Sequence, residues 1–211
     1  EFVSRDWSSD VCSSDLGILV DLGLSSIQLG YDSRGFAFES NGKLDMRFDG
    51  HSGETAAELM ARSSEKELAD IIYQFGEERH SRRIARTIKS LPNLMTVADL
   101  KDAVRRSTPP RQRHKSLARV FQAIRIAVNG ELDKLNAFLE CFTDYLTIGG
   151  RVVILSYHSL EDRMVKHTFR ALKQSGILKI ITKKPLVPSP EEQANNSRSR
   201  SAKLRVAERI A

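Results

Sequence analysis

Residues 151–157 read RVVILSY, and residues 17–23 read GILVDLG. Both runs are short, apolar and rich in aliphatic residues, which is typical of strands buried in a parallel sheet. Asp21 lies near the end of the first run, and His158 directly follows the second. Stretches with helical spacing separate the two runs. Strands that alternate with long helices predict an α/β sheet with parallel members.

Helical periodicity covers most of the sequence between the two runs. Ser64 with Glu67 and Thr96 with Asp99 each match a hydroxyl residue followed three positions later by an acid, which predicts two capped helix starts. The Pro109-Pro110 pair interrupts the periodic pattern. These signals predict several helices of ordinary length in this region.

A second helical stretch leads into and beyond the 151–157 run. Its apolar spacing continues from Ser116 to Phe142, and we expect Gly149-Gly150 to close it. After the run, we expect Ser159 to cap a further helix. The sequence ends with two expected strands, 177–183 and 202–207, joined by a loop rich in proline and serine.

The sequence divides into a leader and two interleaved regions. Residues 1–16 contain the near-repeat WSSD and CSSD and show no helical or strand periodicity, so we interpret them as a non-native leader rather than an irregular N-terminal arm. Residues 54–115 are a predicted helical insertion. Residues 17–53 and 116–211 together form the predicted α/β domain.

Charge is distributed unevenly along the chain. The net charge is +6, from 33 basic and 27 acidic residues. Residues 79–125 hold thirteen basic against two acidic residues (+11), and residues 163–211 hold twelve against three (+9). Two basic segments on an otherwise acidic chain indicate a surface that faces a polyanion. Solvated helix faces are the alternative interpretation, which charge alone leaves open.

Composition and motifs exclude several classes of protein. The sequence has 40% hydrophobic residues, two cysteines and no apolar run long enough to cross a bilayer, so a globular protein without a disulfide framework is expected in the cytoplasm. It contains no G-x-S-x-G motif of hydrolases and no G-x-G-x-x-G or Walker loop for nucleotides. No His or Cys pair has the spacing of metal ligands, so no metal site is expected.

Polar residues cluster where the two apolar runs end, and ligands of open α/β sheets bind beyond the carboxyl ends of strands. Asp21, Ser25, Ser26 and Gln28 follow the first run, and His158 follows the second. Each residue also has a structural interpretation. The two serines can satisfy backbone groups of a turn, and His158 can be a hydrogen-bonded turn residue.

Eight motifs in the chain together resemble one enzyme family. In chain order they are DLGLSSIQL, RGFAF, LDMRFD, TAAELM, YQFGEERHSRRIARTI, FQAIRIAVNGEL, GGRVVILSYHSLEDRMVK and SRSAKLRVAER. They are similar to the small-subunit ribosomal RNA methyltransferase H family, also called MraW, from Gly17 to Ile210. The resemblance implies a class I (Rossmann-like) fold with a helical insertion. It also implies S-adenosylmethionine-dependent methylation of the exocyclic N4 of a cytosine in the decoding region of 16S ribosomal RNA.

The resemblance also implies roles for individual residues. Asp21 and Gln28 match positions that contact the methyl donor. Ser25 and Ser26 fall where other amino-methyltransferases have their catalytic loop. We therefore expect oxygens of Asp21, Ser25 and Ser26 to accept the hydrogens of the target amine, which is a weak nucleophile that needs positioning.

The basic segments supply the expected contacts with 16S ribosomal RNA in the small ribosomal subunit. Phosphate binding is the expected role of most of these side chains, and substrate positioning is that of Arg125 and His158. The expected RNA-contacting residues are Arg79, Arg82, Arg83, Arg86, Arg111, Arg113, Lys115, Arg125, His158, Arg198, Arg200 and Lys203. No membrane partner is expected, and the choice between a monomer and a homodimer stays open.

The chain departs from the family pattern in two places. Ile27 stands where the family usually has proline. The first third of the family, with its glycine-rich cofactor loop, has no counterpart in this sequence, which predicts an inactive fragment of the enzyme. The alternative interpretation is a non-catalytic module that binds RNA or the ribosome.

Overall fold

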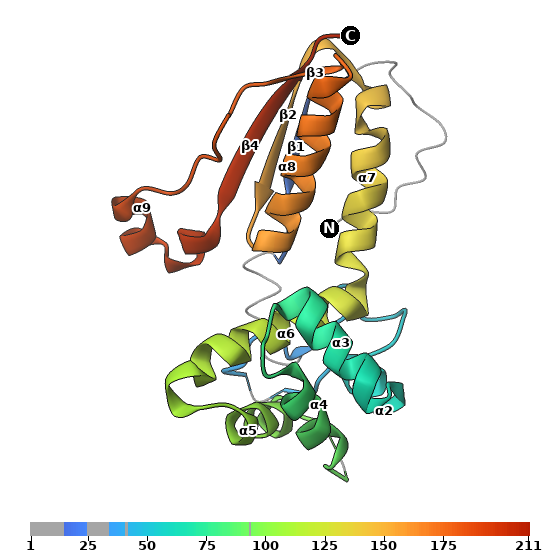
Figure 1. The fold of residues 1–211 in the computed structure, drawn as a ribbon, viewed down its shortest axis with the longest axis vertical. Helices are drawn as coiled ribbons and strands as arrows, with labels where there is room; N and C mark the ends of the chain where they lie inside the picture. Colours follow the sequence, from blue (N-terminus) through green and yellow to red (C-terminus); the bar gives the residue numbers. More distant parts are fainter. Residues whose placement is uncertain (1–14, 25–33, 41, 93) are drawn as a thin grey trace. The chain divides into compact units, whose positions relative to one another are not determined.

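The computed structural model describes residues 15–24, 34–40, 42–92 and 94–211 (Figure 1). These residues form two compact units. Unit 1 contains residues 15–23 and Leu132–Ala211, and unit 2 contains Leu24–Glu131. Unit 2 extends beyond the expected insertion at 54–115 on both sides. Within the described part of the chain, no helix combines the length and apolarity that a membrane span needs.

Unit 1 is built on a four-stranded sheet. The strands are β1 (Asp15–Asp21), β2 (Leu146–Ser156), β3 (Leu178–Ile180) and β4 (Lys203–Arg209), in the spatial order β1-β2-β4-β3. The pair β1–β2 is parallel, and β4 is antiparallel to both β2 and β3. The prediction of an α/β sheet with parallel members is thus confirmed for the two apolar runs.

Two long helices cover one face of this sheet, and Figure 1 shows α8 in front of the strands. They are α7 (Glu131–Tyr145) and α8 (Ser159–Gln174). Apolar side chains of both helices and of the strands form one buried cluster, because strand residues of alternate positions point to the same face. The cluster comprises Val20, Leu135, Leu139, Phe142, Leu146, Val152, Ile154, Val165, Phe169, Leu178 and Ala207.

Several expected boundaries in this region were wrong. The helical pattern from Ser116 to Phe142 is divided, because Gly130 adopts a left-handed conformation (φ 58°) that ends the preceding helix. Gly149-Gly150 lies inside β2 instead of closing a helix. The expected strand 177–183 is shorter at Leu178–Ile180, and the loop before β4 contains two short helices, α9 (Pro190–Asn195) and η3 (Ser197–Ser201).

The N-cap of α8 is His158 and not Ser159, which corrects another expectation. The His158 backbone is extended (φ −139°, ψ 166°), and its ring nitrogen Nδ1 accepts the backbone N–H of Glu161 at 3.4 Å. The Glu161 carboxylate in turn accepts the backbone N–H of His158. An imidazole thus fills the capping role that a hydroxyl usually performs.

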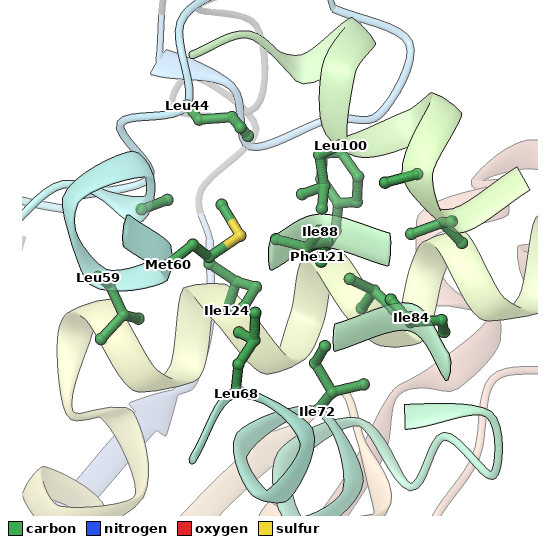
Figure 2. Close-up of a cluster of buried hydrophobic side chains, with 14 of the residues drawn as sticks. Leu44, Leu59, Met60, Leu68, Ile72, Ile84, Ile88, Leu100, Phe121 and Ile124 are labelled. Carbon is green, nitrogen blue, oxygen red and sulfur yellow. The ribbon is translucent and has the colours of Figure 1, made fainter. Parts of the chain in front are cut away.

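Unit 2 is helical. Its elements are α2 (Ala56–Arg62), α3 (Glu65–Gly76), α4 (Ser81–Lys89), α5 (Val97–Ser107), η2 (Pro110–Gln112) and α6 (Arg113–Asn129). The capping boxes predicted at Ser64 and Thr96 are both formed. Figure 2 shows the core, to which residues from all five α-helices and from the loop before α2 contribute, among them Leu44, Met60, Leu68, Ile72, Ile84, Leu100 and Ile124.

The central contact of unit 2 lies between α3 and α6. A Cβ atom at Gly76 would lie 2.6 Å from the carbonyl oxygen of Arg119, so only glycine permits this approach. Beside it, the side-chain amide of Gln122 donates to the carbonyl of Phe75 at 2.9 Å. The α3–α6 packing therefore fixes the end of α3 and the segment that leads into α4.

Candidate functional site

The carboxyl ends of β1 and β2 lie side by side, as their parallel pairing requires. Asp21 is the last residue of β1 and pairs with Leu155 of β2. The backbone continues this pairing for one residue, because the N–H of Leu22 donates to the carbonyl of Leu155 at 3.1 Å. Polar side chains that leave these two strands therefore meet at one edge of the sheet.

Tyr157, the first residue after β2, contacts Asp21 directly. Its hydroxyl group donates a hydrogen bond to Oδ1 of Asp21 at 2.8 Å. Asp21 is exposed, whereas Tyr157 is half-buried. Burial, the hydrogen bond to Asp21 and the negative charges of Asp21 and Glu161 raise the pKa of Tyr157 to about 12. The phenol therefore keeps its proton at neutral pH and serves as a donor to the carboxylate.

Gly23 allows the chain to turn away from β1 beside this pair. Its φ of +94° lies in the left-handed region that favours glycine. A Cβ atom there would lie 3.5 Å from Cδ2 of Tyr157, so the tyrosine ring lies against the turn. The exit of β1 is thus adjacent to the ring of Tyr157 as well as to its hydroxyl.

The first turn of α8 anchors the segment after β2. Glu161 is buried (3% exposed), and its Oε2 accepts the backbone N–H of Tyr157 at 2.9 Å. The His158 side chain is 7% exposed, and its Nε2 lies 3.2 Å from Oε1 of Glu161 without hydrogen-bond geometry. The structure thus places His158 in the capping arrangement of α8, and its expected contact with RNA stays a prediction.

An ion-pair network connects the first turn of α8 to β4. Asp162 Oδ1 accepts from Nε of Arg205 at 2.7 Å, and its Oδ2 accepts from Nζ of Lys203 at 3.3 Å. Burial of Asp162 opposes ionisation, but the hydrogen bond and charge of Arg205, with the charge of Lys203, outweigh it and lower the pKa of Asp162. Lys203, an expected RNA contact, therefore already has an acidic partner.

Unit 2 carries most of the other expected RNA contacts. Helix α4 buries Ile84, Ala85 and Ile88, so its cations lie on the opposite, exposed face. The exposed cations predicted as RNA contacts in this unit are Arg79, Arg82, Arg83, Arg86, Arg111, Arg113 and Lys115. Arg125 differs because it is half-buried and forms two hydrogen bonds with Glu131, at 2.8 and 3.0 Å. Arg86 lies 3.3 Å from Glu65.

Three contacts join α4, α5 and η2, which carry several of the exposed arginines of unit 2. Arg83 donates from Nε to the carbonyl of Ser107 at the end of α5. The hydroxyl of Ser107 donates to Oγ1 of Thr87 in α4 at 2.8 Å. Nε2 of His80 lies 3.1 Å from Oε1 of Gln112 in η2. The start of α4, the end of α5 and η2 are therefore neighbours.

We call the exposed arginines around these contacts the basic junction. It comprises Arg79, Arg82, Arg83, Arg105, Arg106, Arg111 and Arg113. The sequence prediction missed Arg105 and Arg106, although both lie in the first basic segment and in the last turn of a capped amphipathic helix. That position, three and four residues before Pro109, was the available signal. Clustered arginines of this kind can bind several phosphates of one polyanion.

The remaining expected residues divide into two groups. Arg198 and Arg200 are exposed on η3 of unit 1. Ser25, Ser26 and Gln28 lie outside the described residues, so their expected roles in catalysis and donor binding stay predictions. Of the predicted catalytic and donor-contacting residues, the structure therefore describes Asp21.

The ion-pair network predicts a pH-dependent stability. Asp162→Asn should lower the free energy of unfolding by about 2 kcal/mol at pH 7, because Arg205 would stay buried beside a neutral group. The folded-state pKa of Asp162 is lowered, so the contribution of its charge is complete above the ordinary value of 3.8 and is lost as the pH falls through the folded-state pKa. Denaturant titrations at pH 7 and pH 3 measure this difference.

Asp133→Asn, on the exposed side of α7, is the matched control and should leave the unfolding free energy unchanged. An Asp162→Asn effect that is as large at pH 3 as at pH 7 would contradict the ion-pair assignment.

Comparisons with known proteins identify the family. The profile of the MraW methylase family matches residues 3–210. The chain is 52% identical to the ribosomal RNA small subunit methyltransferase H of Acaryochloris marina over 198 residues, which cover 92% of this chain and 65% of the relative. Proteins of the same name from Cyanothece sp. and Kosmotoga olearia are 51% and 50% identical over 195 and 200 residues. Each of these matches includes 92% of this chain, and they cover 65% and 66% of the two relatives, respectively.

The chain thus spans about 65% of the length of the curated relatives that it matches. Its mixed α/β sheet with parallel β1 and β2 agrees with the class I methyltransferase fold of the matched family, which confirms the expected fold class. The family suggested by the sequence motifs is also confirmed. On the match of residues 3–210 and on identities of 50–52% to three relatives, the chain belongs to the MraW methylase family.

Proposed function

We propose that this chain is part of an enzyme that transfers a methyl group from S-adenosylmethionine to N4 of a cytidine in the decoding region of 16S ribosomal RNA. The observation that carries the proposal is the family match over residues 3–210. The names of the relatives, ribosomal RNA small subunit methyltransferase H, support the substrate. Because the chain spans about 65% of those relatives, the activity is proposed for the whole protein.

Asp21 fits a role in binding the methyl donor. Its carboxylate is exposed at the carboxyl end of β1, where open α/β sheets bind ligands, and Tyr157 occupies only one of its oxygens. S-adenosylmethionine presents amine and hydroxyl donors that a carboxylate can accept. When bound, this cofactor supplies an electrophilic methyl group. Gln28 is the second proposed contact.

The chemistry on the protein side is positioning. The target amine is conjugated into the cytosine ring, so its lone pair is a poor nucleophile. Acceptors that hold the two amine hydrogens orient the lone pair and stabilise the charge that develops on nitrogen. We assign this task to oxygens of Asp21, Ser25 and Ser26. The target base must leave its stack to reach them.

The basic junction of unit 2 is the proposed phosphate-binding surface for the RNA, with Arg86, Lys115, Arg198 and Arg200 as further contacts. Its arginines are exposed and lie on α4, α5 and η2, just before α4 and at the first residue of α6. This arrangement supports electrostatic binding that positions the RNA without reading its sequence. The target cytidine would be selected by the site at the strand ends.

Charge reversal in the basic junction tests RNA binding. Arg82→Glu combined with Arg111→Glu should weaken binding to a decoding-region RNA hairpin by about tenfold or more, because phosphate contacts dominate affinity. The slope of log K against log salt concentration should fall by about 0.9 for each lost contact. Fluorescence anisotropy at several salt concentrations measures both quantities. Lys134→Glu, an exposed cation of α7, serves as the control. Equal affinity and slope in both variants would contradict the proposed surface.

Methyl transfer tests the proposed activity. In a version extended to the length of the relatives, Asp21→Ala should reduce methyl transfer to small ribosomal subunits by about 100-fold, as loss of a positioned polar group does in other enzymes. Nuclease digestion and mass spectrometry should identify N4-methylcytidine as the product. Asp144→Ala, an exposed aspartate of α7, should leave the rate unchanged.

An unchanged rate in Asp21→Ala would overturn the role of Asp21. RNA binding without any saturable binding of S-adenosylmethionine or methyl transfer would favour the non-catalytic RNA-binding module instead.

A further inference from the structure

We propose that Tyr157 is the positioning residue for Asp21: its hydroxyl holds one carboxylate oxygen, so that the other is presented to the ligand in a fixed direction. The proposal rests on the function proposed above, in which Asp21 contacts the methyl donor. It adds a residue that the sequence motifs did not single out for any role.

The strand pairing brings the two residues together. Asp21 ends β1, and Tyr157 is the second residue after Leu155, the β2 partner of Asp21. Tyr157 follows directly after Ser156, the last residue of β2, and so lies at the sheet edge where β1 also ends. This places the phenol above the end of β1, where its hydroxyl lies 2.8 Å from Oδ1 of Asp21.

Two contacts restrict Tyr157, one at its backbone and one at its ring. Its backbone N–H is bonded to the buried carboxylate of Glu161 at 2.9 Å, which ties it to the first turn of α8. Its ring lies against Gly23, whose positive φ turns the chain after β1. Because its backbone and ring are held, the hydroxyl of Tyr157 has a fixed position and can restrict the rotation of the Asp21 carboxylate.

Asp21 needs such support because it is exposed. A solvated carboxylate rotates freely, and ordering it at the moment of ligand binding costs conformational entropy. The hydrogen bond from Tyr157 restricts the carboxylate before the ligand arrives. An ionised carboxylate has about four acceptor sites on two oxygens, so Oδ2 remains able to accept from an amine or hydroxyl group.

A double-mutant cycle tests the positioning role. Tyr157→Phe keeps the ring against Gly23 and removes only the hydroxyl. Calorimetry on the 211-residue chain should show affinity for S-adenosylmethionine about tenfold weaker in Tyr157→Phe, the size expected for a lost hydrogen bond to a charged group. In an Asp21→Ala background, which offers no acceptor to the hydroxyl, the same change should have no further effect. Tyr73→Phe, an exposed tyrosine of α3, should change neither affinity.

Equal losses in both backgrounds would show that Tyr157 acts through general structure and would overturn the proposal. No loss in either background would overturn it as well.

A second measurement separates this proposal from the proposed function. In protein labelled with ¹³C at the aspartate carboxyl carbons, the signal that disappears in Asp21→Asn is that of Asp21. At neutral pH this signal should move in Tyr157→Phe and stay in place in Tyr73→Phe. If the signal moves but the wild-type chain binds no S-adenosylmethionine, donor binding by this chain fails while the Tyr157–Asp21 contact stands. If the signal does not move, the positioning proposal fails whatever the cofactor does.

Discussion

The parallel pairing of β1 with β2 determines what unit 1 can do. Five consecutive register pairs, from Gly17–Arg151 to Asp21–Leu155, bring the ends of two segments that are more than 120 positions apart in the chain to one sheet edge. Parallel strands require a long crossover connection, which here contains all of unit 2. A slip of one residue in this register would move Asp21 to the other face, away from Tyr157. The candidate site therefore depends on backbone hydrogen bonds before it depends on any side chain.

The residues after the two strands have different tasks. Buried Glu161 and His158 organise the start of α8, and Asp162 pairs with Arg205 of β4. Asp21 stays exposed, as its proposed contact with the methyl donor requires. The cluster of polar residues after β2 thus serves mainly to hold the backbone, because buried polar groups must find partners within the protein. In unit 2, by contrast, the arginines of the basic junction are exposed to solvent.

Sequence periodicity was sufficient for the two apolar strands and for the capped helices of unit 2. It failed at Gly130, which ends α6 in a left-handed conformation although the apolar spacing continues past it. It also failed at Gly149, which was expected to end a helix but lies within β2. Asp21 was predicted as a site residue because it is a carboxylate at a strand end, and the structure places it there. Tyr157 was not predicted, because its partner lies 136 positions away and local sequence carries no signal of that contact. Arg105 lies in a basic segment that the sequence does show, but its exposure and its neighbours in α4 and η2 are properties of the fold.

The β1–β2 pairing continues to Leu22, the residue after Asp21. The most direct test is amide hydrogen exchange of Leu22, whose N–H donates to the carbonyl of Leu155 at 3.1 Å. If the register is as described, this amide should exchange as slowly as those of Val152 and Ile154 within β2, through openings that cost most of the unfolding free energy. An exchange rate at Leu22 close to that of an unprotected amide would show that the strand ends are not joined. It would contradict the placement of Asp21 beside Tyr157.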